Sequence, residues 1–218
     1  MARQTKTREL IEAVLRGENP QKNYQQAYDL ALTQACKIPA RALERLGVVR
    51  ESTGQLSVAV LAGKFHVDLT AGKVKDDRGQ DAPVAWAILV LHYLLSRPAG
   101  ESVQSHISFM DIPDARGYAK PYQGRVVRRF LYTAGRDEAT FRSAADRLGG
   151  EKLDLSDAAY EFAVFPQVHV RVIWYRGDDE VLPGASFLYA REIADIFCVE
   201  DIVVMSELLV GALAAKKS

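Results

Sequence analysis

The chain is very poor in cysteine, with only Cys36 and Cys198 among its 218 residues. Two widely separated cysteines cannot form a disulfide framework, and they cannot supply the four ligands of a structural zinc or an iron–sulfur cluster. The absence of C-x-x-C also excludes zinc ribbons, thioredoxin-like redox centres and attached c-type haem. We therefore expect two small buried cysteines. We also expect a colourless, metal-free protein when it is produced in a host that lacks the relevant pathway.

Neither sign of charge is in excess, because Lys plus Arg and Asp plus Glu stand at 28 each. A dedicated nucleic-acid or anionic-membrane binder would carry surplus positive charge. The longest apolar run, 83–95, is too short to span a bilayer and is typical of a buried core helix. Residues 1–18 contain charge but no apolar h-region, so they do not form a secretory signal. The sequence predicts a cytoplasmic protein with no nucleic-acid or membrane partner.

Local catalytic motifs are missing as well. The chain has no P-loop, no G-x-G-x-x-G after a strand, no G-x-S-x-G elbow and no H-E-x-x-H. It also lacks the D-x-H-x-x-G loop that supplies a lower cobalt ligand in many corrinoid carriers. Each motif is contiguous and would be visible, so the enzymes and carriers that depend on them are excluded.

The residues that are present predict one soluble domain. Apolar residues make up 48% of the chain, which is enough for a substantial core at this length. We expect a single domain over 1–218, with a helical N-terminal part at 1–50 and an α+β core at 51–218. In the N-terminal part, Asn19-Pro20 is a helix-start signal, and Pro39 ends that helix before a short one at 40–46.

Apolar alternation with period two predicts the strands. They are expected at 56–61, 65–69, 103–109, 160–165, 168–175 and 186–190. Short connections between them favour antiparallel pairing. Helical spacing predicts helices at 83–95, 121–131, 141–148 and from 199 onward. The expected fold class is α+β: an antiparallel sheet with a buried central helix, a helical N-terminal region and a C-terminal helix.

The least ordinary residues lie between 160 and 189. There, Trp174 ends an apolar run and is followed by the acidic tip Asp178-Asp179-Glu180. The acids could bind a cation or could form a solubilising loop tip. Trp174 fits either the core or a ligand platform.

The histidines offer further candidates. His106 shares a strand face with Ser108 beside a loop that contains Asp111, an arrangement that suits either acid–base chemistry or a solvated polar face. His92 is expected to be a hydrogen-bonded core residue. His169 and Arg171 should be exposed and could pair with Glu161 across strands. A basic helix face could hold an oxyanion or simply be solvated; it comprises Arg125, Arg128 and Arg129.

Three segments carry a resemblance to a known family. They are GESVQSHISFMDIPDARGYAKPY (100–122), FAVFPQVHVRVIWYRGDDEVLP (162–183) and Phe187-Leu188-Tyr189. The second is similar to a family signature of an aromatic residue followed by G-D-[DE]-E-x-x-P. The chain thereby resembles a prokaryotic family of unknown function from anaerobes, associated with corrinoid-methyltransferase and iron–sulfur proteins. Some relatives carry a cysteine-rich cluster-binding segment, which this chain lacks.

The resemblance implies a link to corrinoid or other tetrapyrrole metabolism, without an iron–sulfur cluster. We expect a non-catalytic ligand-binding or accessory module whose partner is a small molecule or a protein, and we expect no metal site. Any tetrapyrrole would take at most one axial side chain, from His106 or His169. The expected binding residues border a cleft between 106–122 and 177–183: His106, Tyr118, Tyr122, Trp174, Asp178, Asp179 and Glu180. The alternative is an enzyme with a dispersed acid–base site that uses His106, Asp111 or Asp178.

Overall fold

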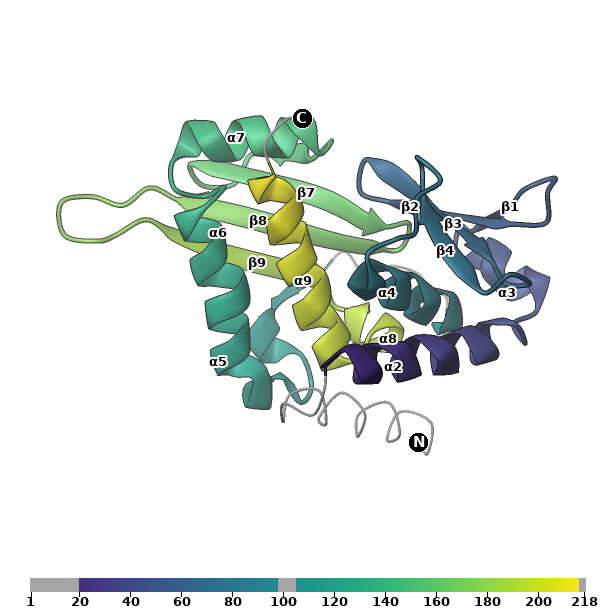
Figure 1. The fold of residues 1–218 in the computed structure, drawn as a ribbon. Helices are drawn as coiled ribbons and strands as arrows, with labels where there is room; N and C mark the ends of the chain where they lie inside the picture. The colour runs from purple at the N-terminus through teal and green to yellow at the C-terminus, as the bar shows by residue number, and fades with distance from the viewer. Residues whose placement is uncertain (1–19, 98–104, 216–218) are drawn as a thin grey trace.

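The computed structural model describes residues 20–97 and 105–215. These residues form two separate antiparallel sheets, and helices pack between and beside them (Figure 1). The N-terminal helices are α2 (Pro20–Ala35) and α3 (Ala40–Arg45). Both match the helices that the proline signals predict.

The smaller sheet has four strands in the order β1-β2-β3-β4. Its strands are β1 (Val49–Arg50), β2 (Leu56–Val60), β3 (Gly63–Asp68) and β4 (Lys73–Asp76). The predicted hairpin of 56–69 is confirmed as the antiparallel pair of β2 and β3. Val58, Val67 and Val74 are buried on the same face of this smaller sheet, as the alternation of side chains along a strand requires.

Helix α4 (Val84–Leu95) is the predicted central helix, and seven of its residues are buried. It is apolar on nearly all sides because it packs against α2, α9 and an aromatic group. Its Tyr93 hydroxyl donates a hydrogen bond to the Leu46 carbonyl at 2.6 Å, and the ring stacks on Phe165 with centroids 4.7 Å apart.

The larger sheet has five antiparallel strands in the order β5-β9-β8-β7-β6. They are β5 (His106–Ser108), β6 (Glu151–Leu153), β7 (Ala158–Phe165), β8 (Val168–Tyr175) and β9 (Gly184–Ala190). Strands β7, β8 and β9 follow one another as hairpins, whereas β5 joins the edge of β9 from a distant part of the sequence. The β8–β9 hairpin projects well beyond the helices (Figure 1).

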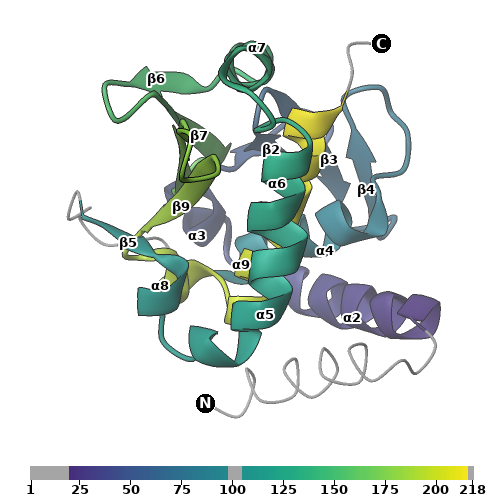
Figure 2. The same cartoon turned by 90° about the vertical axis from the view of Figure 1, so that its left-hand side faces the viewer.

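One face of the larger sheet is covered by helices. A continuous helical segment comprises α5 (Ala119–Tyr122), a π-helical stretch (Gln123–Arg128) and α6 (Arg129–Tyr132). Together with α7 (Glu138–Arg147) and α9 (Val199–Ala214), it lies on the same side of the sheet (Figure 2). The short α8 (Ile193–Ile196) connects β9 to α9. We call this covered side the inner face and the opposite side the outer face.

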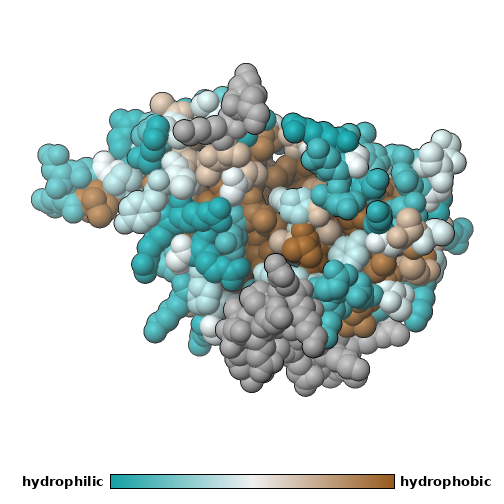
Figure 3. All heavy atoms as spheres, viewed as in Figure 1, coloured by the Kyte–Doolittle hydropathy of each residue, from teal (hydrophilic) through white to brown (hydrophobic). Residues whose placement is uncertain are grey.

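The core fills the space between the inner face and these helices. Phe130, Phe141 and Phe187 meet edge to face there. Apolar residues also reach the surface in the middle of one side of the molecule, along α9, while the rim and the projecting hairpin are mostly polar (Figure 3).

The predicted α+β class with antiparallel strands, an N-terminal helix and a long C-terminal helix is confirmed. The predicted strands, however, divide between two sheets, because 56–69 pairs with β1 and β4 rather than with β5 to β9. The predicted strand at 103–109 extends over only 106–108 of the described residues, since Phe109 begins a 3-10 turn that is capped by Ser108. None of the described helices is both long and apolar enough to cross a membrane.

Candidate functional site

Two of the expected binding residues lie inside the core. Trp174 is 3% exposed, and its indole N–H donates to the Gly135 carbonyl at 2.7 Å. Tyr122 stacks on Phe109 with centroids 3.8 Å apart, and its hydroxyl lies 3.0 Å from that of Tyr189. These aromatic residues stabilise the inner face. Tyr118 is half-buried against the same core.

The three expected acidic residues lie at the tip of the β8–β9 hairpin. Asp178 shapes this turn, because its Oδ1 accepts hydrogen bonds from the backbone N–H groups of Glu180 and Val181 at 2.9 and 2.7 Å. These bonds lower the pKa of Asp178 below its usual value. Asp179 and Glu180 are exposed. Asp111 has a similar local role, since it accepts hydrogen bonds from both the hydroxyl and the backbone N–H of Ser108.

His106 is the exception among the expected residues, because it joins a polar group on the outer face. Its Nε2 lies 3.4 Å from Glu161 Oε1, although two strands separate their backbones. The Arg171 Nε donates to the same carboxylate oxygen at 2.6 Å, and His169 Nδ1 lies 3.5 Å from the other oxygen. We call His106, Glu161, His169 and Arg171 the outer-face cluster. The expected pairing of Glu161 with Arg171 is confirmed.

The outer-face cluster is partly shielded from water. The side chain of His106 is 12% exposed and that of Glu161 is 18% exposed, whereas His169 is 41% exposed. Small residues lie beside the two histidines in the ladder: Ala190 opposite His106 and Ala163 opposite His169. They leave room for Glu161 to reach across the sheet.

The charges of the cluster set the protonation of its members. Burial and the Arg171 guanidinium lower the pKa of His106, while the Glu161 carboxylate opposes that shift. Burial would raise the pKa of Glu161, but Arg171 and the histidines outweigh it and hold the pKa below its ordinary value. Near neutral pH the cluster therefore contains an ionised carboxylate beside a neutral His106.

His106 is also unusual in its hydrogen bonding. Both ring nitrogens are buried, and neither has a hydrogen-bond partner within the described residues, because the contact with Glu161 is not aligned. An unpaired buried polar group costs about 1–3 kcal/mol, so it requires an explanation.

A second buried polar group joins α4 to α9. His92 Nδ1 lies 2.9 and 3.0 Å from the two carboxylate oxygens of Asp201, as expected for a hydrogen-bonded core histidine. The Cys198 thiol donates to the same carboxylate at 3.2 Å. The expectation of buried cysteines is wrong, since Cys36 and Cys198 are both exposed. Cys198 is the N-cap residue that precedes α9, and Cys36 directly follows α2, so both lie at helix ends.

The expected basic helix face is largely paired. Arg125 donates to Glu207 at 2.6 and 2.8 Å, and Arg129 lies 3.3 Å from the same carboxylate. The partner Glu207 lies on α9, so Arg125 attaches the π-helical segment to α9 and Arg129 attaches the start of α6 to it. Arg128 is exposed.

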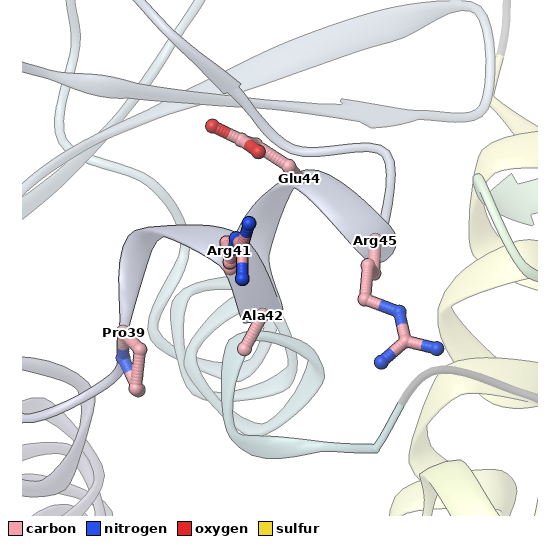
Figure 4. A pocket seen from close by; sticks show the side chains of 5 residues that line it. All are labelled: Pro39, Arg41, Ala42, Glu44 and Arg45. Atoms are coloured by element: carbon pink, nitrogen blue, oxygen red, sulfur yellow. The ribbon is translucent and has the colours of Figure 1, made fainter.

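The molecule also has a surface depression of about 510 Å³ on α3, and no residue of the outer-face cluster lines it. Its lining residues are Pro39, Arg41, Ala42, Glu44 and Arg45 (Figure 4). None of the expected binding residues contributes to it. Within 20–97 and 105–215, no group of three or more His, Cys, Asp or Glu residues is arranged to hold a metal ion.

A family model for a domain of unknown function, DUF3786, matches residues 39–212. The chain belongs to this family. The match includes the outer-face cluster, both sheets and the depression on α3, so each of these features lies within the family domain. No curated protein and no solved structure matches the chain.

Sequence reasoning missed the cluster as a unit. The sequence predicts Glu161 as a partner of His169 and Arg171, but it does not connect His106 with these three residues. Strand alternation places each of them on a sheet face, but their meeting depends on the strand order β5-β9-β8-β7. That order cannot be read from any local pattern.

Proposed function

We propose that the protein is a non-catalytic ligand-binding or accessory module whose ligand contacts the outer face at His106. The observation that carries this proposal is the buried His106 imidazole, whose two nitrogens have no hydrogen-bond partner among the described residues. A ligand that engages either nitrogen would remove the cost of the unpaired group. Burial and the Arg171 guanidinium would keep the imidazole neutral.

We infer that the ligand is a corrinoid or another tetrapyrrole, the class that the sequence resemblance suggests. A neutral imidazole can offer a lone pair to cobalt or iron, and the lowered pKa of His106 favours that form at neutral pH. Ala163 and Ala190 present little side chain on the same face, which would allow a flat ligand to approach the sheet. His169 is the more exposed of the two histidines and is the second candidate for the axial position.

Binding is favoured over catalysis by the separation of the candidate acid–base groups. Asp111 and Asp178 each accept hydrogen bonds within their own local turns. Among these three candidates, His106 is the one that lies within ion-pair distance of another described residue, at 3.4 Å from Glu161. The balance of positive and negative charge supports a small molecule or a protein as the partner rather than nucleic acid or a membrane.

The experiment is an absorption titration with aquocobinamide, a corrinoid that lacks its own lower nitrogen base. We expect a saturable spectral change with one equivalent of protein, because His106 would become the axial base. His106→Ala should abolish the change. His66→Ala is the matched control, because His66 lies on the other sheet beside Glu51 and should leave the titration unaltered.

An unchanged spectrum with the native protein would refute the corrinoid as ligand. A spectral change that persists in His106→Ala but disappears in His169→Ala would move the axial position to His169. A change that persists when His106→Ala and His169→Ala are combined in one protein would refute the outer face as the site.

A further inference from the structure

The tip of the β8–β9 hairpin is a structured turn that displays apolar residues. Asp178 closes it through three hydrogen bonds, one of which runs from its own N–H to the Val181 carbonyl at 2.9 Å. Gly177 is packed so closely against Val181 and Pro183 that any side chain there would overlap with their backbone. This geometry holds Val181 and Leu182 outward, where they are 62% and 87% exposed.

Apolar and acidic groups lie side by side on this tip. Asp179 and Glu180, both exposed, immediately precede Val181 and Leu182. A tight turn has no need of two large exposed apolar residues, because turns in water are normally polar. The tip therefore has the chemistry of a docking element for a surface that is apolar in the middle and positively charged at its edge.

The depression on α3 has that complementary chemistry. Pro39 and Ala42 supply its apolar lining, and Arg41 and Arg45 stand beside them (Figure 4). Neither guanidinium pairs with a carboxylate in the part of the chain that the structure describes. Glu44 also borders the depression, but its side chain extends in a different direction from that of Arg45 (Figure 4).

The depression is held in place by the body of the protein. The Gln167 side chain donates to the Arg45 carbonyl at 2.6 Å, which ties the end of α3 to the turn between β7 and β8. Gly47, with φ +75°, lies against Pro166, where an added Cβ would come within 2.9 Å of the proline ring. Both the tip and the depression are therefore preformed surfaces.

The two surfaces lie at opposite ends of the molecule (Figure 1). The hairpin of one molecule therefore cannot reach its own α3. We propose that the β8–β9 tip of one copy docks into the α3 depression of a second copy, so that the protein associates head to tail. This contact is heterologous, because each copy contributes a different surface, and it can continue into short chains. It does not depend on the ligand site proposed above.

The contact is small, so the association should be weak. Interfaces at the low end of the size range form transient complexes, and we expect a dissociation constant on the order of 100 µM. Because charged side chains on both surfaces contribute, raising the salt concentration should weaken the association.

Sedimentation velocity over a concentration series tests the proposal. We expect the native protein to show a rising weight-average mass, and Leu182→Asp to remain monomeric. The double variant Arg41→Glu/Arg45→Glu should also remain monomeric. Tyr132→Ser is the matched control: Tyr132 is 82% exposed on α6, away from both surfaces, so it should associate like the native protein.

Mixing the variants gives the decisive result. Leu182→Asp retains a working depression, and Arg41→Glu/Arg45→Glu retains a working tip. An equal mixture should therefore form a dimer and nothing larger. A monomeric native protein at millimolar concentration, undiminished association of either variant, or a mixture that stays monomeric would each overturn the proposal. Thermal unfolding of both variants should match that of the native protein, because all substituted residues are exposed.

Discussion

Replacing Asp201 by asparagine should remove a pH-dependent part of the folding stability. Asp201 lies on α9, and its two carboxylate oxygens are 2.9 and 3.0 Å from Nδ1 of His92 on α4. The side chain of Asp201 is only 11% exposed and that of His92 only 14%. The two helices form much of the core, so this pair connects elements that must separate on unfolding. Asparagine has the same shape and keeps an oxygen acceptor, but it lacks the charge.

The sign of the effect follows from the pKa of His92. Burial alone would lower this pKa, but the charge and hydrogen bond of Asp201 outweigh burial and raise it above the ordinary value. A histidine with a raised pKa in the folded state stabilises the protein fully at pH values below its unfolded pKa, about 6.5. That stabilisation is lost as the pH rises through the folded pKa.

The magnitude can be set from the type of contact. A hydrogen bond to a charged partner contributes about 1.5–3 kcal/mol, and a neutral one about 0.5–1.5 kcal/mol. Asp201→Asn exchanges the first kind for the second, so it should lower the free energy of unfolding by about 1–2 kcal/mol at pH 5.5. As the pH rises through the raised pKa of His92, the difference should become smaller.

The assay is urea unfolding of both proteins between pH 5.5 and 9, with the native His92 titration followed by NMR. Asp146→Asn, at an exposed position on α7, is the control for loss of a surface carboxylate. The reasoning is refuted if the difference between native protein and Asp201→Asn is constant with pH. It is also refuted if His92 titrates below pH 6.5 in the native protein.

Three further predictions concern stability and composition. Gly135→Ala should lower the free energy of unfolding by about 1–3 kcal/mol in urea titration, because the added methyl would overlap with the ring of Phe130. Tyr189→Phe should cost about 1–3 kcal/mol and more than Tyr122→Phe, since it removes the hydrogen-bond partner of Tyr122 and one of the two partners of Ser206; comparison of the two denaturation curves checks this. Elemental analysis after gel filtration should find no stoichiometric iron or zinc in protein made without the relevant pathway, and either metal at one equivalent would contradict it.

Local patterns predicted those parts of the fold whose partners are near in sequence. Alternation in 56–69 and 160–175 identified two hairpins, because side-chain period and turn residues are local properties. The division into two sheets and the addition of β5 to the edge of β9 were not predictable in this way. The pairing of β5 with β9 joins segments about eighty residues apart, and its register is decided by packing.

The observed places of two candidate residues had a signal in the sequence. Trp174 has the same parity as Val170 and Val172, both on the inner face, so alternation places it in the core rather than on a ligand platform. Asp178 stands two and three residues before the N–H groups that it accepts, which is the usual spacing of an aspartate that closes its own turn.

The expected binding residues do not come together in one site, because they lie on different surfaces of the larger sheet. His106 belongs to the outer face, Tyr122 and Trp174 to the inner face, and Asp178 to the hairpin tip. A sheet separates its two faces completely, because successive side chains point in opposite directions. Substitutions of Tyr122 or Trp174 should therefore change the free energy of unfolding, whereas substitutions of His106 should change ligand binding. A variant series that mixes both effects at one residue would contradict this separation of the two faces.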